Sequence, residues 1–376
     1  MATKSGGSTR PAPPGQVVLV LQGGGALGAY QAGVYQALHE AGIEPDWIIG
    51  TSIGAINGAL IAGNRADERC ARLTAFWDGI TRDIPPAAAW WLDAGRSLTH
   101  LETVTHGIAG FFEPNPRAFL GVHTRLGIED AGYYRTVGLR DTLRELVDFT
   151  ELNSQQCRLS LGAVSVDGGK MHYFDTRDGA LDIRHILASG ALPPAFPAVA
   201  IDGKAYWDGG IYSNTPVEAV LDDKPRRSST IFAVQLWNPS GPEPESIWQV
   251  LGRHKEIQYA SRASSHLLRQ EQIHRLRHVI RELVSRLPDG AHEDPAVKQL
   301  ASYGCATRMH LVTLTAPRLP DEDLNKDIDF SRASVNARWE SGYRAARRVL
   351  QEQPWQKQGD FLDGIVIHHA GAGGMT

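Results

Sequence analysis

A single serine stands between two glycines at the point where an apolar run gives way to a helix-forming segment. Trp47–Ile49 is typical of a short buried strand, and Gly50-Thr51-Ser52-Ile53-Gly54 follows it directly. The pattern G-x-S-x-G between a strand and a helix is typical of a nucleophile elbow. Gly50 and Gly54 supply the small residues that such a turn requires, and the helix N-terminus favours developing negative charge. We therefore predict that Ser52 is a nucleophile.

A glycine-rich turn precedes this serine, after the first apolar run of the chain. Val17–Leu21 is rich in valine and leucine, as in a strand buried on both faces, and Gly23–Gly28 comes directly after Gln22. A helix with an apolar stripe follows and closes near Gly42. Glycines at the end of a strand can present bare backbone N–H groups. Beside Ser52, such groups would form an oxyanion hole for a tetrahedral intermediate.

The same glycines allow a second interpretation. Gly23–Gly28 also satisfies G-x-G-x-x-G, the dinucleotide-binding fingerprint, and Asp46 lies 18 residues beyond Gly28. In that fingerprint an acidic residue ends the second strand, whereas Asp46 precedes the apolar run Trp47–Ile49. A non-catalytic dinucleotide-binding or scaffold protein therefore remains the alternative to a serine hydrolase.

Three ordered motifs together resemble the patatin-like phospholipase family. They are Gly23-Gly24-Gly25-Ala26-Leu27-Gly28, Gly50-Thr51-Ser52-Ile53-Gly54 and Asp208-Gly209-Gly210, and the resemblance covers roughly residues 16–220. The block Ala188-Ser189-Gly190-Ala191-Leu192-Pro193-Pro194-Ala195-Phe196-Pro197 is similar to the family's loop ahead of its aspartate. The sequence departs from the family at one point: many members carry Arg or Lys here, whereas this chain has Ala26-Leu27.

The resemblance implies a fold and a mechanism. The fold is α/β, with a central, mostly parallel sheet flanked by helices in three layers. The mechanism is acyl-ester hydrolysis without a cofactor, by a dyad of the nucleophile Ser52 and the proton acceptor Asp208. Gly24 and Gly25 would donate N–H groups to the oxyanion, with Gly23 and Gly28 shaping the turn, and Gly209-Gly210 would complete the aspartate motif.

A second Asp-Gly-Gly competes for the role of the base. Asp167-Gly168-Gly169 separates Arg158–Val166 from Met171–Phe174, two runs that predict a hairpin. The turn requirement alone explains Asp167, because Asp-Gly supplies the positive φ angles of a two-residue hairpin. Asp208 follows the proline block of the resemblance, and we predict that it is the base.

A serine hydrolase of another class would carry a histidine. His254, His266 and His310 are candidates for a Ser-Asp-His triad, but His254 and His266 lie in a polar helical pattern. Only His310 is near a late strand, Met309–Leu314. The sequence contains no cluster with metal-ligand spacing, so we predict no metal.

The composition limits the protein class and its compartment. The chain has 376 residues, 42% of them hydrophobic, and a net charge of -4, which gives no case for nucleic acid. Three cysteines without metal-like spacing, Cys70, Cys157 and Cys305, favour a reducing compartment, and no window predicts a transmembrane helix. We expect a cytoplasmic protein that is at most peripheral to a membrane.

The chain divides into three parts by character. Residues 1–15 read as a disordered tail, 16–240 as the catalytic domain and 241–376 as a helical C-terminal region. Ile231–Leu236 reads as the last buried strand, and long polar helices are expected at about Ser246–Leu287 and Ser331–Leu350. The segment from Pro85 to Arg135 is irregular and rich in aromatics. It is either a loop packed on the core or a cap that lines an acyl pocket.

Residues 253–286 combine a basic face with an apolar stripe. Eight Lys or Arg stand against three Glu, an excess of 8 − 3 = +5; the basic residues are Arg253, Lys255, Arg262, Arg269, Arg275, Arg277, Arg281 and Arg286. The stripe is made of Ile273, Leu276, Ile280, Leu283 and Leu287. The segment is either a helix packed on the core or a contact with an anionic membrane. In the second case, His254, His266, His274 and His278 would strengthen attachment at low pH.

Overall fold

The computed structural model describes residues 12–82, 105–319, 322, 324–357, 360 and 362–370, and of residues 261–266 and 370 it describes the backbone alone. Most of the expected tail and the pair Trp90-Trp91 lie outside these ranges. None of the helices within them combines the length and the apolar character needed to cross a membrane.

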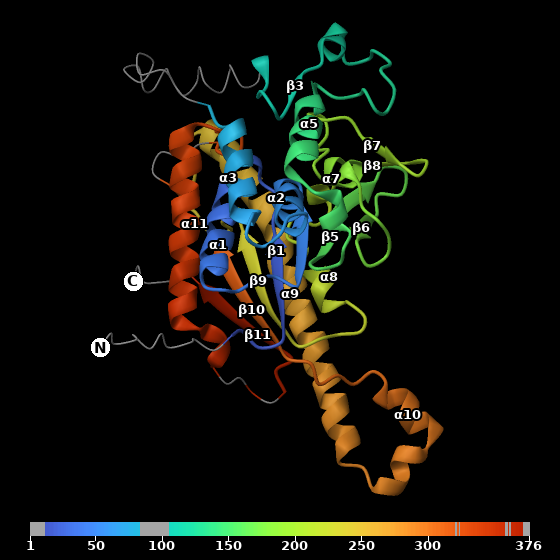
Figure 1. Cartoon of the computed structure of the whole chain (residues 1–376). Helices are drawn as coiled ribbons and strands as arrows, with labels where there is room; N and C mark the ends of the chain where they lie inside the picture. The colour runs from blue at the N-terminus through green and yellow to red at the C-terminus, as the bar shows by residue number, and fades with distance from the viewer. Residues whose placement is uncertain are drawn as a thin grey trace, which may run out of the picture.

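A mixed sheet forms the centre of the protein (Figure 1). In the described residues it has nine strands in the order β11-β10-β9-β1-β2-β5-β8-β7, and β6 also pairs with β5. From β11 to β5 all neighbours are parallel, whereas β6, β8 and β7 join antiparallel. The strands are β1 (Gln16–Leu21), β2 (Trp47–Thr51), β5 (Arg158–Ser165), β6 (Met171–Asp175), β7 (Val199–Ile201), β8 (Lys204–Asp208), β9 (Ser229–Gln235), β10 (Met309–Thr315) and β11 (Ile365–Ala370). The prediction of a mostly parallel sheet is confirmed.

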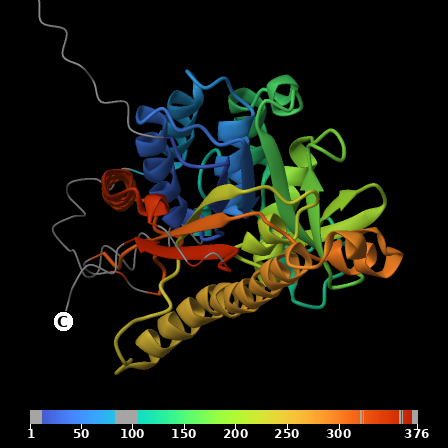
Figure 2. The ribbon, with the colours of Figure 1, turned by 90° about the horizontal axis from the view of Figure 1, so that it is seen from below.

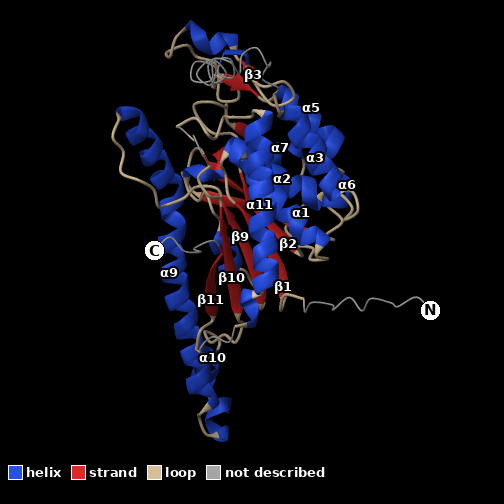
Figure 3. Ribbon diagram, turned by 90° about the vertical axis from the view of Figure 1, so that its left-hand side faces the viewer, coloured by secondary structure: helices blue, strands red, loops and turns tan. Residues whose placement is uncertain are grey.

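Helices cover both faces of this sheet, as Figure 3 shows from the side. The alternation along β1 explains how: Leu19 and Leu21 belong to one buried cluster, and Val18 and Val20 to another on the opposite face. The first cluster packs against α1 (Ala29–Glu40), α2 (Ile53–Ala62), α3 (Arg69–Ile80), α5 (Val137–Leu146), α7 (Ile183–Ser189) and α11 (Arg332–Glu352). The second packs against α8 (Val217–Leu221) and α9 (Ile247–Ser285). The layers position β1 and β2 at the centre, where the glycine turn and the serine follow them.

Smaller elements fill the connections. They are η1 (Gly25–Gly28), β3 (Glu113–Pro114), η3 (Pro116–Leu120), β4 (Tyr134–Arg135), α6 (Phe149–Leu152), η4 (Gly209–Ile211), η5 (Asp289–Glu293), α10 (Pro295–Ala301) and η6 (Pro354–Gln356). The strands β3 and β4 pair as a separate two-stranded sheet in the aromatic segment.

The C-terminal region contributes to the sheet as well as supplying helices. β10 matches the late strand expected at Met309–Leu314 and pairs with β9 along its whole length, and β11 pairs with β10. The expectation that Ile231–Leu236 is the last buried strand is therefore wrong. A boundary near residue 240 would pass through this sheet. The helix α11 also packs closely on α1: a Cβ on Gly33 would lie 1.9 Å from the carbonyl oxygen of Trp339, and one on Gly342 2.0 Å from that of Tyr30.

The long helix α9 matches the predicted Ser246–Leu287, but it packs with a different face from the expected apolar stripe. Among the side chains of α9 that the structure describes, those that are buried are Glu256, Ala260, Leu267, His274 and His278. Leu276 and Leu283 of the stripe are 63% and 61% exposed. The expectation of histidines that charge on the surface is wrong for His274, because burial lowers its pKa to about 4. Figure 2 shows α9 lying along the sheet and ending near α10.

Candidate active site

Ser52 occupies a strained corner between β2 and α2. Its backbone has φ 57° and ψ −125°, a conformation that few residues other than glycine adopt. The corner is tight on both sides: a Cβ on Gly50 would lie 2.3 Å from the carbonyl oxygen of Gly54, and one on Gly54 2.2 Å from that of Leu21. The predicted elbow therefore has the expected geometry, and both flanking glycines are required by the close approach of backbone.

A buried carboxyl group faces the serine. Asp208 ends β8 and is 1% exposed, and its carboxyl group accepts hydrogen bonds from the Ser52 hydroxyl and from the Gly210 N–H, the latter at 2.7 Å. Burial raises the pKa of Asp208 to about 7, although both hydrogen bonds oppose the shift. Ser52 and Asp208 are thus brought together as predicted. The other candidate, Asp167, lies exposed in the hairpin turn between β5 and β6.

The glycine turn lies beside the serine, at the carboxyl end of β1. The Gly23 N–H donates to the carbonyl oxygen of Asn214 at 3.2 Å, and the Ala26 N–H donates to that of Asp327 at 2.8 Å. Within the described part of the chain, the N–H groups of Gly24 and Gly25 have no hydrogen-bond acceptor. These are the two groups predicted to face an oxyanion. Gly28, the last residue of η1, is required by packing, because a Cβ there would lie 2.5 Å from the side chain of Ile53.

Three side chains that the sequence analysis did not single out hold this turn in place. Asn214 Nδ2 donates to the Gly23 carbonyl at 3.1 Å, and Trp237 Nε1 donates to the same oxygen at 2.9 Å. The Gln22 side chain accepts from the Trp237 N–H at 3.0 Å and donates to Thr215 Oγ1 at 2.6 Å. Asn214 lies in the segment after Asp208-Gly209-Gly210, so proximity to that motif could have indicated it. Trp237 carried no such signal.

Ser189 supports the elbow from the proline block. The Ser52 N–H donates to the Ser189 carbonyl oxygen at 3.1 Å and lies 3.2 Å from Ser189 Oγ. Ser189 Oγ in turn donates to the Gly162 carbonyl of β5 at 2.6 Å. The block similar to the family's loop therefore contributes a backbone acceptor that fixes the serine corner.

A cavity of about 230 Å³ opens beside Ser52 and Asp208. Its polar end is formed by Gly24, Gly25, Ser52 and Asp208, and the rest of its lining is mostly apolar, including Ile53, Ile56, Phe111, Phe112, Tyr134, Leu139, Leu187, Leu192, Phe196 and Phe330. Phe111, Phe112 and Tyr134 come from the aromatic segment 85–135, so its described part lines the cavity. Phe119 of the same segment is 62% exposed. Phe112 also belongs to the buried core and Phe111 packs against it, so both interpretations of the segment apply to these residues, whereas Phe119 fits neither.

The residues on which the alternatives depended lie elsewhere. Asp46 sits at the amino end of β2, where its Oδ2 accepts the Val17 N–H at 2.8 Å, so it is not placed as a ribose-binding acid would be. His310 pairs with His368 at 3.1 Å between β10 and β11. Among the described residues no histidine lines the cavity, and no group of three or more His, Cys, Asp or Glu is placed to hold a metal ion.

Comparison with known proteins gives matches over most of the chain. A family model described as patatin-like phospholipase matches residues 19–221, and a second, described as patatin phospholipase, matches residues 257–361. An uncharacterised NTE family protein of Mycobacterium bovis is 29% identical over 216 residues, which are 57% of this chain and 47% of that protein. Lysophospholipase nte1 of Aspergillus terreus is 51% identical over 69 residues, 16% of this chain and 4% of that protein. The chain thus spans less than half the length of these curated relatives.

Among solved structures, VipD from Legionella pneumophila aligns over 90% of this chain and 67% of its own, with 16% identity and a TM-score of 0.38.

Proposed function

The chain belongs to the patatin-like phospholipase family, and we propose from this premise that it is a serine hydrolase of lipid acyl esters. One observation carries the proposal: the hydroxyl of a serine on a strained corner is hydrogen-bonded to a buried carboxyl group, at the polar end of an otherwise apolar cavity. Nucleophile, base and acyl-binding surface are then contiguous.

In the acylation step, Ser52 Oγ attacks the ester carbonyl carbon while Asp208 takes the hydroxyl proton. The carbonyl oxygen becomes an oxyanion, which the N–H groups of Gly24 and Gly25 and the N-terminus of α2 stabilise. The intermediate collapses as the C–O bond to the alcohol breaks, and the proton passes from Asp208 to the leaving oxygen. The products of this step are an acyl-Ser52 ester and a free alcohol.

Deacylation repeats the sequence with water. Asp208 accepts a proton from a water molecule as the water oxygen attacks the carbonyl carbon of the acyl-serine. Asp208 then returns that proton to Ser52 Oγ as the fatty acid leaves. An ordinary aspartate, with a pKa of about 3.9, is a weak base for a hydroxyl. Burial makes Asp208 a better one by raising its pKa to about 7.

Covalent labelling tests this proposal. A fluorophosphonate probe should react with Ser52 by displacement of fluoride, and Ser52→Ala should lose both the labelling and ester hydrolysis while its thermal midpoint stays close to that of the parent. Labelling at another serine, or full hydrolysis by Ser52→Ala, would refute the assignment. Tight NAD(P) binding without labelling would favour the dinucleotide-binding alternative.

The cavity gives an expectation for the acyl chain. The cavity of about 230 Å³ is somewhat larger than an apolar cavity of about 150 Å³ that holds one benzene molecule, so it has room for part of an acyl chain. We therefore expect hydrolysis to be fastest for acyl chains of medium length among soluble esters of graded length. A rate that keeps rising to long chains would show that the chain extends beyond this cavity.

The proposed contact with an anionic membrane through residues 253–286 now rests on fewer groups. Arg253, Lys255 and Arg286 pair with acidic side chains, whereas Leu268, Leu276 and Leu283 are at least 61% exposed, and Arg269 and Arg275 are exposed beside them. In Figure 1 the C-terminal part of α9 extends past the end of the sheet opposite β3 and α5. Contact there would tether the protein to a membrane, but it would not bring the cavity to it.

Co-sedimentation with vesicles distinguishes α9 from the tip of the aromatic segment, two of the surfaces that expose apolar residues. If α9 is the tether, an Arg269→Glu/Arg275→Glu variant should lose binding to anionic vesicles, and added salt should weaken binding by the parent. The matched variant Leu120→Ser/Val122→Ser changes the exposed tip of the aromatic segment, where these side chains are 76% and 81% exposed. Loss of binding in this variant alone would assign the contact to the tip.

A further inference from the structure

A segment from the C-terminal region lies directly over the glycine turn. The carbonyl oxygen of Asp327 accepts the Ala26 N–H at 2.8 Å, and a Cβ on Gly25, whose φ is +56°, would lie 2.2 Å from that oxygen. Asp327, Ile328 and Phe330 also line the cavity beside Ser52. The turn that we propose for the oxyanion is therefore held on one side by backbone from about 300 residues later in the chain.

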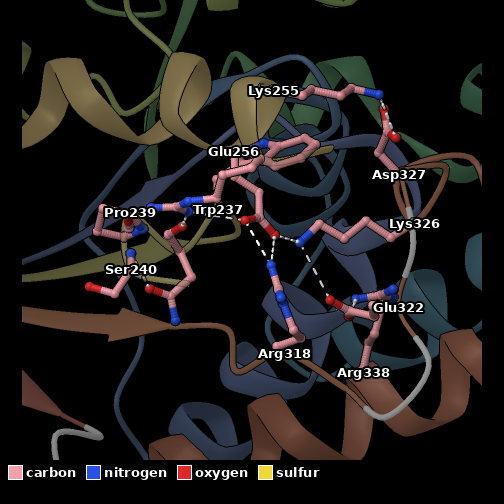
Figure 4. Close-up of polar contacts among 12 residues, drawn as sticks. Trp237, Pro239, Ser240, Lys255, Glu256, Arg318, Glu322, Lys326, Asp327 and Arg338 are labelled. Carbon is pink, nitrogen blue, oxygen red and sulfur yellow. Dashed lines mark hydrogen bonds and ion pairs between the residues drawn. The ribbon is translucent and has the colours of Figure 1, made fainter. Parts of the chain in front are cut away.

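Two successive residues of α9 hold two successive residues of this segment (Figure 4). Lys255 Nζ lies 2.7 Å and 2.8 Å from the two carboxylate oxygens of Asp327. Glu256 Oε1 accepts from Lys326 Nζ at 2.5 Å. α9 therefore holds the segment through two ion pairs, one with a basic and one with an acidic residue of the helix. One of these pairs involves Asp327, the residue whose carbonyl oxygen accepts the Ala26 N–H.

The two pairs differ in burial, and so in what each can do. The Glu256 and Lys326 side chains are 4% and 8% exposed, and Glu256 also receives Arg318 at 2.8 Å and Arg253 at 3.1 Å. Removing one member of such a buried cluster leaves an uncompensated charge and destabilises the fold. Lys255 and Asp327 are 30% and 18% exposed, and a partly exposed pair of this kind contributes little to the free energy of unfolding.

We infer that Lys255 and Asp327 are positioning residues for the oxyanion turn: their ion pair fixes the Asp327 carbonyl against Ala26 and so keeps the Gly24 and Gly25 N–H groups directed at the Ser52 side. The inference rests on the proposed hydrolase function. The Glu256 cluster holds the segment in place, and the Lys255–Asp327 pair fixes the position of the Asp327 carbonyl to within a fraction of an ångström. Catalysis is sensitive to displacements of this size, because donors must lie about 2.7–3.1 Å from the oxyanion.

The decisive measurement is the effect of Lys255→Met on kcat and KM for a soluble ester and on the rate of fluorophosphonate labelling. We expect kcat and the labelling rate to fall about tenfold, a part of the loss seen when one oxyanion donor is removed. KM should change less than about twofold, because the acyl-binding surface is intact, and the thermal midpoint should stay close to that of the parent. Lys255→Arg should retain most of the activity.

Two further variants guard the result. Lys298→Met removes a comparable pair on α10, Lys298–Glu293 at 2.6 Å, which is remote from the cavity, and it should leave kcat unchanged. The charge swap Lys255→Asp/Asp327→Lys should recover part of the rate lost in Lys255→Asp alone. If Lys255→Met has the kcat and the labelling rate of the parent, the inference is wrong. It is also wrong if kcat and the thermal midpoint of Lys255→Met fall together and the charge swap does not recover the rate. If Ser52→Ala remains active, the proposed function fails; if Ser52 reacts and Lys255→Met is unimpaired, only this inference fails.

Discussion

Two copies of the tripeptide Asp-Gly-Gly occupy opposite environments in this protein. Asp167-Gly168-Gly169 forms the turn between β5 and β6, and all three residues are exposed. Asp208-Gly209-Gly210 ends β8 with its carboxyl group 1% exposed and hydrogen-bonded to Ser52. In the first copy, Val164 pairs with Met171 and the Ser165 N–H donates to the Lys170 carbonyl oxygen, so the hairpin loop is longer than the predicted two-residue turn. Of the three residues of this copy only Gly169 has positive φ, at +58°.

The difference teaches that the tripeptide does not itself define a base. Both copies adjoin β5: the first follows it in the hairpin to β6, and the second lies on β8, which pairs with β5 at Ala163 and Asp208. Only in the second copy is the carboxyl group buried, and burial raises its pKa toward neutrality. The raised pKa of Asp208 thus depends on desolvation, to which distant parts of the chain contribute.

The largest expected effect comes from exchanging each aspartate in turn. Asp208→Asn keeps the shape of the side chain but cannot accept a proton, so kcat should fall by about 10²–10⁴-fold, the usual contribution of a general base. Asp167→Asn is the matched control and should leave kcat within experimental error. The assignment of the base is wrong if Asp167→Asn loses ester hydrolysis and Asp208→Asn retains it.

A smaller effect is expected from the glycines, again in matched positions. Gly25 and Gly169 both have positive φ, at +56° and +58°, so alanine strains the backbone at each. At Gly25 the new Cβ would also meet the Asp327 carbonyl and displace a proposed oxyanion donor, so kcat should fall by about a hundredfold or more. At Gly169 nothing lies within 4 Å, and Gly169→Ala should lower only the thermal midpoint. Equal kinetics for the two variants would remove Gly25 from the site.

The smallest effect is a pH dependence belonging to Asp208. Since its pKa is raised to about 7, kcat/KM should fall about tenfold for each pH unit below that value, as the base becomes protonated. The raised pKa also favours folding at low pH. That contribution is complete below about 3.8 and is lost as the pH rises through about 7. Asp208→Asn should reduce the pH dependence of the thermal denaturation midpoint across this window. An acid limb near pH 4 in the plot of kcat/KM against pH for the parent would argue against a buried base.

The local parts of this site could be predicted from the sequence because they depend on short segments. The elbow at Ser52 follows from a strand, two glycines and a helix, and parallel strands bring the Gly23–Gly28 turn to the same edge. The motifs also predict Asp208, whose carboxyl group lies beside Ser52 in the structure. The positions of Trp237 and Asp327 depend instead on how segments far apart in sequence pack, and no local pattern ties residue 327 to residue 25.

The edge strand β11 and the packing face of α9 could not be predicted for related reasons, whereas β10 matches the late strand expected at Met309–Leu314. β11 includes His368 and His369 and lies at the edge of the sheet, so it lacks the continuous apolar run of a central parallel strand. On α9 the side chains toward the core include Glu256, which accepts a hydrogen bond from Lys326 Nζ, and His274, whose Nε2 lies 3.2 Å from the Leu221 carbonyl oxygen. A stripe of leucines was the more obvious prediction, although it is the side that remains exposed.

The position of β9 has a consequence for synthesis of the chain. β9 pairs with β1 on one side and with β10 on the other, and β10 ends 80 residues later, at residue 315 against residue 235. At about 5–20 residues per second, the ribosome adds those residues over roughly 4–16 s. During that interval β9 is an unfinished edge, with backbone N–H and C=O groups open to pairing with another chain. Ser52, the Gly23–Gly28 turn and Asp208 are therefore synthesised before β10, and the edge of their sheet at β9 stays open to pairing with other chains until β10 is added.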